Sequence, residues 1–344
     1  MIALRRVLAR LSLPIHPKQT AMLCFVPIIL LSLCAFAQRA TITSFDPPGS
    51  VQTIPLSINA GGSVTGYYSD GSAIHAFLRA PDGSFTVIDG PGATATYGWT
   101  INRTGWIAGY YYDSQMSHGL LRSPDGNLIS FDPPGSTRTT PQSINAAGTV
   151  TGYYRDSSSR SHAFLRNSDG TIITFDPPGS TSTTAISINS AGAITGSYRD
   201  SAQLFHGYLR SPDGVFTTFL AQAGQDTKPV GINSAGEITG TSGPANDPVA
   251  FVRAPDGTIT TFAPHNATAV VPGGINDAGR ITGFDVDPQG NLHGFVRRSD
   301  GTFLMFGLPG VTFIFPFSIN SAGEITGYYQ QNVDTTPHGF LLSP

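Results

Sequence analysis

The sequence has little of the chemistry on which most enzymes depend. Only two of its 344 residues are cysteines, Cys24 and Cys34, and both stand in an apolar N-terminal segment. Glutamate is as rare, with Glu237 and Glu324 the only two, and Lys228 is the only lysine after position 37. Beyond position 37 the chain therefore has no disulfide and no thiol chemistry, so its stability has to come from packing.

The first 37 residues are typical of an export signal. Basic residues precede an apolar run that starts at Ala21 and ends in the small-x-small pattern Ala35-Phe36-Ala37. We predict a signal peptide over residues 1–37, the alternative being an uncleaved anchor. Because the remainder, 38–344, holds 15 basic and 22 acidic residues, its net charge is −7. Such a surface repels phosphate backbones, so we expect a secreted, extracellular or periplasmic protein with no membrane span after cleavage and no nucleic-acid partner.

Motifs for metals, cofactors and catalysis are missing as well. The sequence contains no His-Glu-x-x-His, no Gly-x-Ser-x-Gly and no phosphate loop. Six of its eight histidines occupy one recurring position, which would spread them over the fold rather than gather them at one point. We therefore predict no catalytic residue, no metal site and no cofactor, and we expect each recurring histidine to be buried and bonded to nearby backbone.

An internal repeat dominates what is present. The dipeptide Ile-Asn recurs seven times at intervals of 43 or 44 residues, and a glycine stands three and again seven residues after each asparagine. The seven asparagines are Asn59, Asn102, Asn145, Asn189, Asn233, Asn276 and Asn320.

Each repeat is predicted to contain four strands and no helix. In the third repeat we expect strands over 140–145, 149–154, 162–166 and 171–175. The Asn-x-x-Gly after the first strand predicts a tight hairpin, because asparagine starts such turns and glycine tolerates a left-handed backbone. Forty Gly and 26 Pro in the chain suit a protein with many turns.

The two ends of the repeat region complement each other. The region starts with an unattached fourth strand, Thr41–Phe45, and ends with a unit that has only three strands, the last over 338–342. We therefore predict an all-β fold, a seven-bladed β-propeller of four-stranded antiparallel blades, closed by pairing of the N-terminal strand with the C-terminal blade. An open β-solenoid is the alternative. We expect a monomer.

The motif His-Ala-Phe at His75 and His162, with Ile-Asn-x-x-Gly-x-Ile-x-Gly upstream, resembles the HAF-type extracellular repeats. Four further units carry a His-Gly variant, and Val249 replaces histidine in the fifth. The resemblance covers residues 41–342 and implies export and a repeat fold, but it implies no reaction.

One face of the ring is predicted to vary. All length differences between repeats fall between the second and third strands, whereas the Gly hairpins on the other face are fixed. Tyrosines end the second strand in most units and aspartates follow them. We predict that six of these residues bind a ligand at the rim of the largest cleft: Tyr68, Tyr111, Tyr154, Tyr329, Asp156 and Asp287. The alternative is that each tyrosine packs between blades and each aspartate starts a turn.

Three functions stay open from the sequence. The first is a secreted, non-enzymatic binding or interaction module for a polysaccharide, a peptide or a protein on the variable face. The second is a carbohydrate-active enzyme, a polysaccharide lyase or a glycosidase, on the same scaffold. The third is a surface structural protein.

Overall fold

The computed structural model describes residues 41–244, 247–331 and 336–344, so the predicted signal peptide at 1–37 lies outside the described residues. The described residues form strands and turns without any helix, and hence without a helix able to cross a membrane. The predicted all-β fold is confirmed.

Four strands recur along the chain, each with its own place in a sheet. The innermost strands are β2 (Gln52–Ile58), β6 (Ala95–Ile101), β10 (Arg138–Ile144), β14 (Ser182–Ile188), β18 (Thr227–Ile232), β22 (Ala269–Ile275) and β26 (Val311–Ile319). The second strands are β3 (Val64–Ser69), β7 (Ile107–Tyr112), β11 (Val150–Arg155), β15 (Ile194–Arg199), β19 (Ile238–Ser242), β23 (Ile281–Val286) and β27 (Ile325–Gln331). The third strands are β4 (Ile74–Arg79), β8 (Ser117–Arg122), β12 (Ser161–Arg166), β16 (Phe205–Arg210), β20 (Val249–Arg253), β24 (Leu292–Arg297) and β28 (His338–Ser343). The outermost strands are β1 (Thr41–Phe45), β5 (Phe85–Ile88), β9 (Leu128–Phe131), β13 (Ile172–Phe175), β17 (Phe216–Phe219), β21 (Ile259–Phe262) and β25 (Phe303–Phe306).

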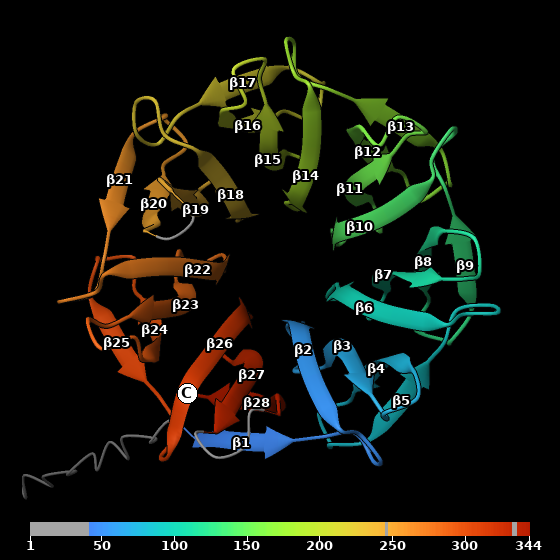
Figure 1. Cartoon of the computed structure of the whole chain (residues 1–344), viewed down its shortest axis with the longest axis horizontal. Coiled ribbons are helices and arrows are strands. Elements are labelled where there is room, and N and C mark those ends of the chain that lie inside the picture. The colour runs from blue at the N-terminus through green and yellow to red at the C-terminus, as the bar shows by residue number, and fades with distance from the viewer. Residues whose placement is uncertain (1–40, 245–246, 332–335) are drawn as a thin grey trace, which may run out of the picture. The chain divides into compact units, whose positions relative to one another are not determined.

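Strands of one unit pair antiparallel in the order in which they occur, as in β14-β15-β16-β17. Within residues 41–344, the sheets follow one another around a centre that the innermost strands face (Figure 1). The strands predicted for the third repeat agree with β10, β11, β12 and β13 to within two residues at each end.

The recurring asparagine organises the first hairpin of each unit. In the third unit, Asn145 Oδ1 accepts hydrogen bonds from the backbone N–H groups of Ala147 and Thr149, each at 3.0 Å. Gly148 lies between these two residues with φ +81°, a conformation that a side chain would penalise. The predicted Asn-x-x-Gly turn is therefore confirmed, and the side chain of the asparagine holds it together.

The same asparagines also join the sheets to one another. Each side-chain Nδ2 donates to the backbone carbonyl of the next asparagine, at 2.9–3.3 Å, and the last bond, from Asn320 to Asn59, returns to the first unit. We call this closed series of seven bonds the asparagine ring. The recurring asparagine therefore has a second role beyond the hairpin, because its side chain also links its unit to the next.

The two ends of the repeat region meet as predicted. Strand β1 pairs antiparallel with β28 in continuous register, from Thr41 opposite Ser343 to Phe45 opposite Gly339. Phe45 is buried and belongs to a core cluster shared with the first unit, in which it contacts Phe77 edge to face at 6.4 Å. The N-terminal strand therefore completes one sheet and packs against the next.

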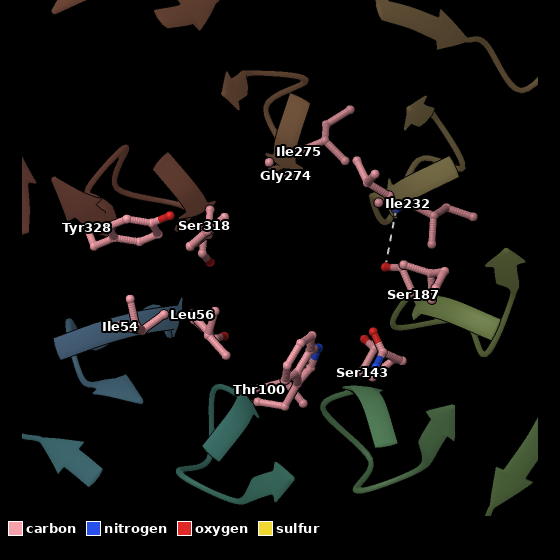
Figure 2. Close-up of a pocket in the computed structure, with 18 of the residues that line it drawn as sticks. Ile54, Leu56, Thr100, Ser143, Ser187, Ile232, Gly274, Ile275, Ser318 and Tyr328 are labelled. Atoms are coloured by element: carbon pink, nitrogen blue, oxygen red, sulfur yellow. Dashed lines mark hydrogen bonds between the residues drawn. The ribbon is translucent and has the colours of Figure 1, made fainter. Parts of the chain in front are cut away.

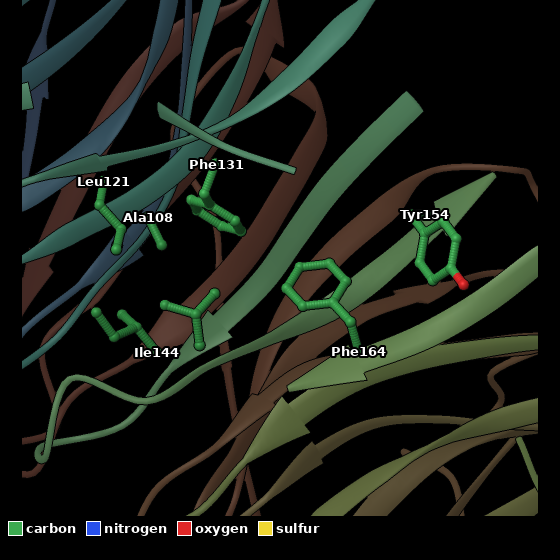
Figure 3. Packing of buried hydrophobic residues seen from close by; sticks show 7 residues of the cluster. Ala108, Leu121, Phe131, Ile144, Tyr154 and Phe164 are labelled. Atoms are coloured by element: carbon green, nitrogen blue, oxygen red, sulfur yellow. The ribbon is translucent and has the colours of Figure 1, made fainter. Parts of the chain in front are cut away.

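Hydrophobic cores lie between successive four-stranded units, the first three of which are joined into one sheet by parallel contacts of β4 with β6 and of β8 with β10. In the cluster drawn in Figure 3, Phe131 of the second unit faces Phe164 of the third, edge to face, with ring centroids 5.9 Å apart. Arg166 crosses the same boundary, its guanidinium 5.1 Å from the ring of Phe131. Such contacts recur around the ring, so each sheet depends on both neighbours for burial of its faces.

Candidate functional site

A β-bulge in every innermost strand places one residue toward the centre. In β2 the pairing with β3 shifts between Pro55 and Ser57, so Leu56 has no partner across the sheet. Opposite the bulge stands Gly66, where a Cβ would lie 2.1 Å from the carbonyl oxygen of Ile54. The second recurring glycine is therefore required by the bulge. The unpaired residues at this recurring bulge are Leu56, Trp99, Gln142, Ile186, Val230, Gly273 and Phe317; β26 has a second shift, which leaves Thr312 unpaired.

All seven bulge residues line one cavity of about 540 Å³, which we call the central cavity (Figure 2). Bulges commonly re-aim a side chain beside a functional site, and here the device is repeated around the ring. Next along each strand comes a second layer that also lines the cavity: Ser57, Thr100, Ser143, Ser187, Gly231, Gly274 and Ser318.

The serines of the second layer keep a donor available. Ser187 Oγ accepts a hydrogen bond from the backbone N–H of Ile232 in the next sheet at 3.3 Å, as drawn in Figure 2. Ser57, Ser143 and Ser318 accept from the following units in the same way. A hydroxyl that only accepts still carries one O–H donor. Within the described residues none of these four hydroxyls donates to a protein group, so their protons are available to a guest.

Aromatic rings gather on one side of the central cavity. Tyr67, Trp99, Phe317 and Tyr328 line it, and all four belong to the seventh, first and second units. Tyr328 contacts Phe317 with centroids 5.7 Å apart. The opposite side carries small or aliphatic residues such as Val230 and Gly274. The cavity is therefore asymmetric although the scaffold repeats.

Uncharged groups dominate this site. No aspartate, glutamate, histidine, lysine or arginine is among the described residues that line the cavity. Burial raises the pKa of Tyr67, and burial together with the nearby Tyr67 raises the pKa of Tyr328. Both phenols therefore stay protonated at neutral pH and can donate as well as accept hydrogen bonds.

The four tyrosines predicted to bind ligand lie elsewhere. Tyr68, Tyr111, Tyr154 and Tyr329 are buried, between 6 and 9% exposed, and none of them lines the central cavity. They therefore do not lie at the rim of the central cavity, and their role in binding a ligand stays a prediction. Successive residues of a strand point to opposite sides, so the neighbours Tyr67 and Tyr328 face the cavity while the predicted residues face the interior.

Each buried tyrosine stacks on the recurring histidine of its unit. Tyr111 lies against His118 with centroids 5.1 Å apart. His118 Nδ1 is 2.6 Å from Asp132 in the following connection, and its Nε2 is 3.1 Å from Asp113 in the preceding loop. Carboxylates rather than backbone thus hold these partly exposed histidines, which corrects the sequence-based expectation of buried, backbone-bonded rings.

The two predicted aspartates belong to this arrangement. Asp156 Oδ1 accepts from the backbone N–H groups of Ser158 and Arg160, and its other oxygen lies 3.4 Å from His162. Asp287 holds the corresponding loop of the sixth unit through two backbone N–H groups. Both residues organise their own loops and lie outside the central cavity, and their role in binding a ligand stays a prediction.

The sixth unit departs from the pattern. Asp285 replaces the stacking tyrosine and is 4% exposed, with Oδ1 lacking a hydrogen bond. His293 is 3.5 Å from this oxygen and its side chain is 45% exposed, more than the other histidines of the series. Burial raises the pKa of Asp285, opposed by the charge of His293. No group of three or more metal-binding side chains in the described residues is placed to hold a metal ion.

The residues of the central cavity were missed although the sequence contains a signal for them. In four units the two residues before the asparagine are Ser-Ile, yet the residue before that pair differs in every unit. A variable position beside a constant one indicates that the fold does not fix the residue type there, so that this residue can instead be selected for ligand binding. The bulge that turns it inward cannot be deduced from alternation alone.

Neither a family model nor a curated protein matches the sequence, so the resemblance to HAF-type repeats stays a prediction. Solved structures do match the fold. A catalytically inactive variant of virginiamycin B lyase from Staphylococcus aureus, solved with quinupristin, is 15% identical with a TM-score of 0.60, covering 89% of this chain and 99% of that one. The β-propeller domain of the Trilobed protease from Pyrococcus furiosus is 10% identical with a TM-score of 0.62, covering 85% and 94%. The fold is a β-propeller. At these identities the likeness shows architecture and carries no activity to this chain.

Proposed function

We propose that this propeller is a secreted binding module that holds a neutral glycan in its central cavity. The observation that carries the proposal is the lining: an aromatic wall, hydroxyl donors and no charged side chain. Sugar rings have an apolar face that stacks on aromatic side chains and hydroxyls that exchange hydrogen bonds with serine and tyrosine. Secretion rests on the sequence of the first 37 residues.

Electrostatics supports a neutral ligand over an acidic one. The chain after the predicted signal carries a net charge of −7, which disfavours the approach of uronic or sulfated glycans. Lys228 does not change this expectation, because its ammonium group lies 3.1 Å from Asp226. The ligand would enter from the face that carries the variable loops, since Tyr67 lies two residues from the end of β3 at that side.

A carbohydrate-active enzyme would need an acid or base beside the scissile bond. The described lining of the central cavity holds no carboxylate, histidine or lysine, and the raised pKa values of Tyr67 and Tyr328 make these phenols poor bases at neutral pH, whereas stacking and hydrogen bonding are both available there. Binding is therefore the function that this geometry supports better.

Two tryptophans allow a sharp test. Trp99 lines the central cavity, whereas Trp106 lies outside it, beside the hairpin face. The mature protein is screened on a glycan array, and hits are titrated into Trp106→Phe, which keeps Trp99 as its only indole, and into Trp99→Phe. A neutral glycan should change the emission of the first variant and not that of the second.

Affinity gives the second readout. Truncating a central aromatic anchor costs about 2 kcal/mol or more, so Trp99→Ala should weaken binding roughly 30-fold. Trp106→Ala should leave it unchanged. An array without hits, hits confined to acidic glycans, or equal effects of both substitutions would refute the proposal.

A further inference from the structure

A second cavity, of about 390 Å³, lies at the outer side of the first unit. It is bordered by the connection from β1 to β2, by the buried Tyr68 and by β5. We call it the outer pocket. The side chains that make its walls are Pro47, Pro48, Tyr68, Phe77, Phe85 and Val87.

The phenol of Tyr68 lacks the hydroxyl partner that two of its counterparts have. Tyr111 is hydrogen bonded to Ser130 on its outermost strand at 3.0 Å, and Tyr329 is bonded to Ser44 at 2.9 Å. In the first unit Val87 occupies the position of those serines. Tyr68 is 6% exposed, its hydroxyl makes no hydrogen bond within the described residues, and that oxygen is not among the fully buried polar atoms that lack a partner. The hydroxyl therefore opens to the pocket, where a ligand group can take the place of water.

An unpaired strand edge borders the same pocket. Strand β5 pairs with β4 on one side, and no strand of the described residues pairs with its other side. Thr86 and Val87 are exposed, Val87 by 51%. Extended peptides bind such edges by adding a strand, and pockets for alternate side chains then provide specificity.

Carboxylates outnumber cations beside the pocket, although the guanidinium of Arg79 approaches Gly83 in its wall. Asp89 follows β5 and holds His75 at 2.8 Å, while Asp70 lies 3.4 Å from the other nitrogen of that ring. Both carboxylates raise the pKa of Tyr68, after the larger effect of burial. An anionic guest is therefore disfavoured, whereas a basic residue next to an apolar one would suit the surroundings.

We propose that the outer pocket binds an extended, basic peptide segment of a partner protein. A proline or β-branched side chain enters the pocket between Phe85 and the Pro47–Pro48 pair, and a backbone carbonyl of the peptide accepts a hydrogen bond from the Tyr68 hydroxyl. The peptide backbone extends the sheet at β5, and a basic side chain beside the apolar one faces Asp89. This site is separate from the central cavity and from the glycan proposed there.

Acetylated ten-residue peptides in which arginine alternates with valine or proline serve as the probe, measured by fluorescence polarisation on the full-length protein. A matched set has glutamate in place of arginine. The basic set should bind and the acidic set should not. Val87→Ser restores the serine found at this position in the second unit, so it should satisfy Tyr68, leave the fold intact and weaken binding at least 10-fold.

Two control variants separate this site from general surface effects. Val215→Ser changes another exposed valine, in the fourth unit, and should bind as the wild type does. Trp99→Ala, which removes a wall of the central cavity, should also leave peptide binding unchanged. Equal binding of both peptide sets, unaltered binding by Val87→Ser, or no binding at all would overturn the proposal.

Discussion

Replacing Asn145 by alanine tests whether the asparagine ring holds the sheets together. The Asn145 side chain is 7% exposed and makes three hydrogen bonds: it accepts from the N–H groups of Ala147 and Thr149 and donates to the carbonyl of Asn189 at 3.3 Å. Alanine leaves all three backbone groups without this partner. At about 0.5–1.5 kcal/mol for each bond, the expected loss is about 2–4 kcal/mol.

The assay is equilibrium unfolding in urea at pH 7, followed by tyrosine and tryptophan emission. Asp169→Ala is the matched control, because Asp169 caps an exposed turn of the same sheet and accepts hydrogen bonds from Thr171. It should cost less than about 1 kcal/mol. Asn145→Asp keeps the acceptor oxygen but turns a second oxygen toward the Asn189 carbonyl. Its stability should therefore lie between those of Asn145→Ala and the wild type only at a pH where the carboxyl is protonated.

If Asn145→Ala costs no more than Asp169→Ala, the ring is incidental and the hairpins are held by backbone bonds alone. If the cost in Asn320→Ala is much smaller than in Asn145→Ala, the bond from Asn320 that returns to the first unit contributes less than the others. Both results would refute the reasoning that one closed series of bonds links every sheet.

Three further predictions follow from the same structure. Deleting residues 41–46 removes β1, exposes the edge of β28 and leaves the Phe45 contacts empty, so light scattering should show concentration-dependent self-association that the full chain lacks. Asp285→Asn should raise the stability at pH 7 by about 1 kcal/mol, because a buried carboxylate without a full set of hydrogen bonds is removed, and the gain should vanish in acid, where the raised pKa leaves the wild-type carboxyl neutral. The pH optimum of stability should lie between about pH 4 and 6.5. Burial acts to lower the pKa of His118, but Asp132 and Asp113 together raise it, so the stabilisation by His118 is present below the ordinary value of 6.5 and is lost as the pH rises. Backbone hydrogen bonds lower the pKa of Asp113, so the stabilisation by Asp113 is lost on acidification. His118→Gln should flatten the alkaline side of the pH profile of stability measured by urea unfolding, and an unchanged profile would contradict the role given to His118.

Much of the architecture could be deduced from the sequence because the recurring residues of the repeat predict its turns and strands. Asparagine and glycine at fixed offsets predict the hairpins, and an unattached strand at 41–45 with a three-stranded unit at the other end predicts the pairing of β1 with β28. These inferences depend on local backbone chemistry and on the need to satisfy strand edges. Neither requires knowledge of which face a side chain takes.

The site could not be deduced in the same way, because it depends on the phase of alternation. Tyr67 and Tyr68 are adjacent, and composition does not distinguish them, yet one lines the central cavity and the other packs against His75. The bulge at Leu56 changes that phase within β2. One unpaired residue thus decides which side chains face the centre, and its presence shows only in the pairing of two strands.

The central cavity can be asymmetric because the fold places few constraints on the residue at the bulge position. The residue before it has to fit the shift in pairing, and the residues after it have to bond to the next sheet, but the bulge residue itself has no partner across the sheet. Gly273 is the exception, because a Cβ there would lie 2.2 Å from the carbonyl oxygen of Pro316 in the next unit. At the other bulge positions, side chains as different in size as Trp99 and Val230 are compatible with the ring. Selection on a ligand can act at those positions without cost to closure. A ring built from near-identical units can in this way carry an aromatic wall on one side only, and substitutions such as Val230→Trp should alter what the cavity accepts while leaving the urea midpoint within the range of surface substitutions.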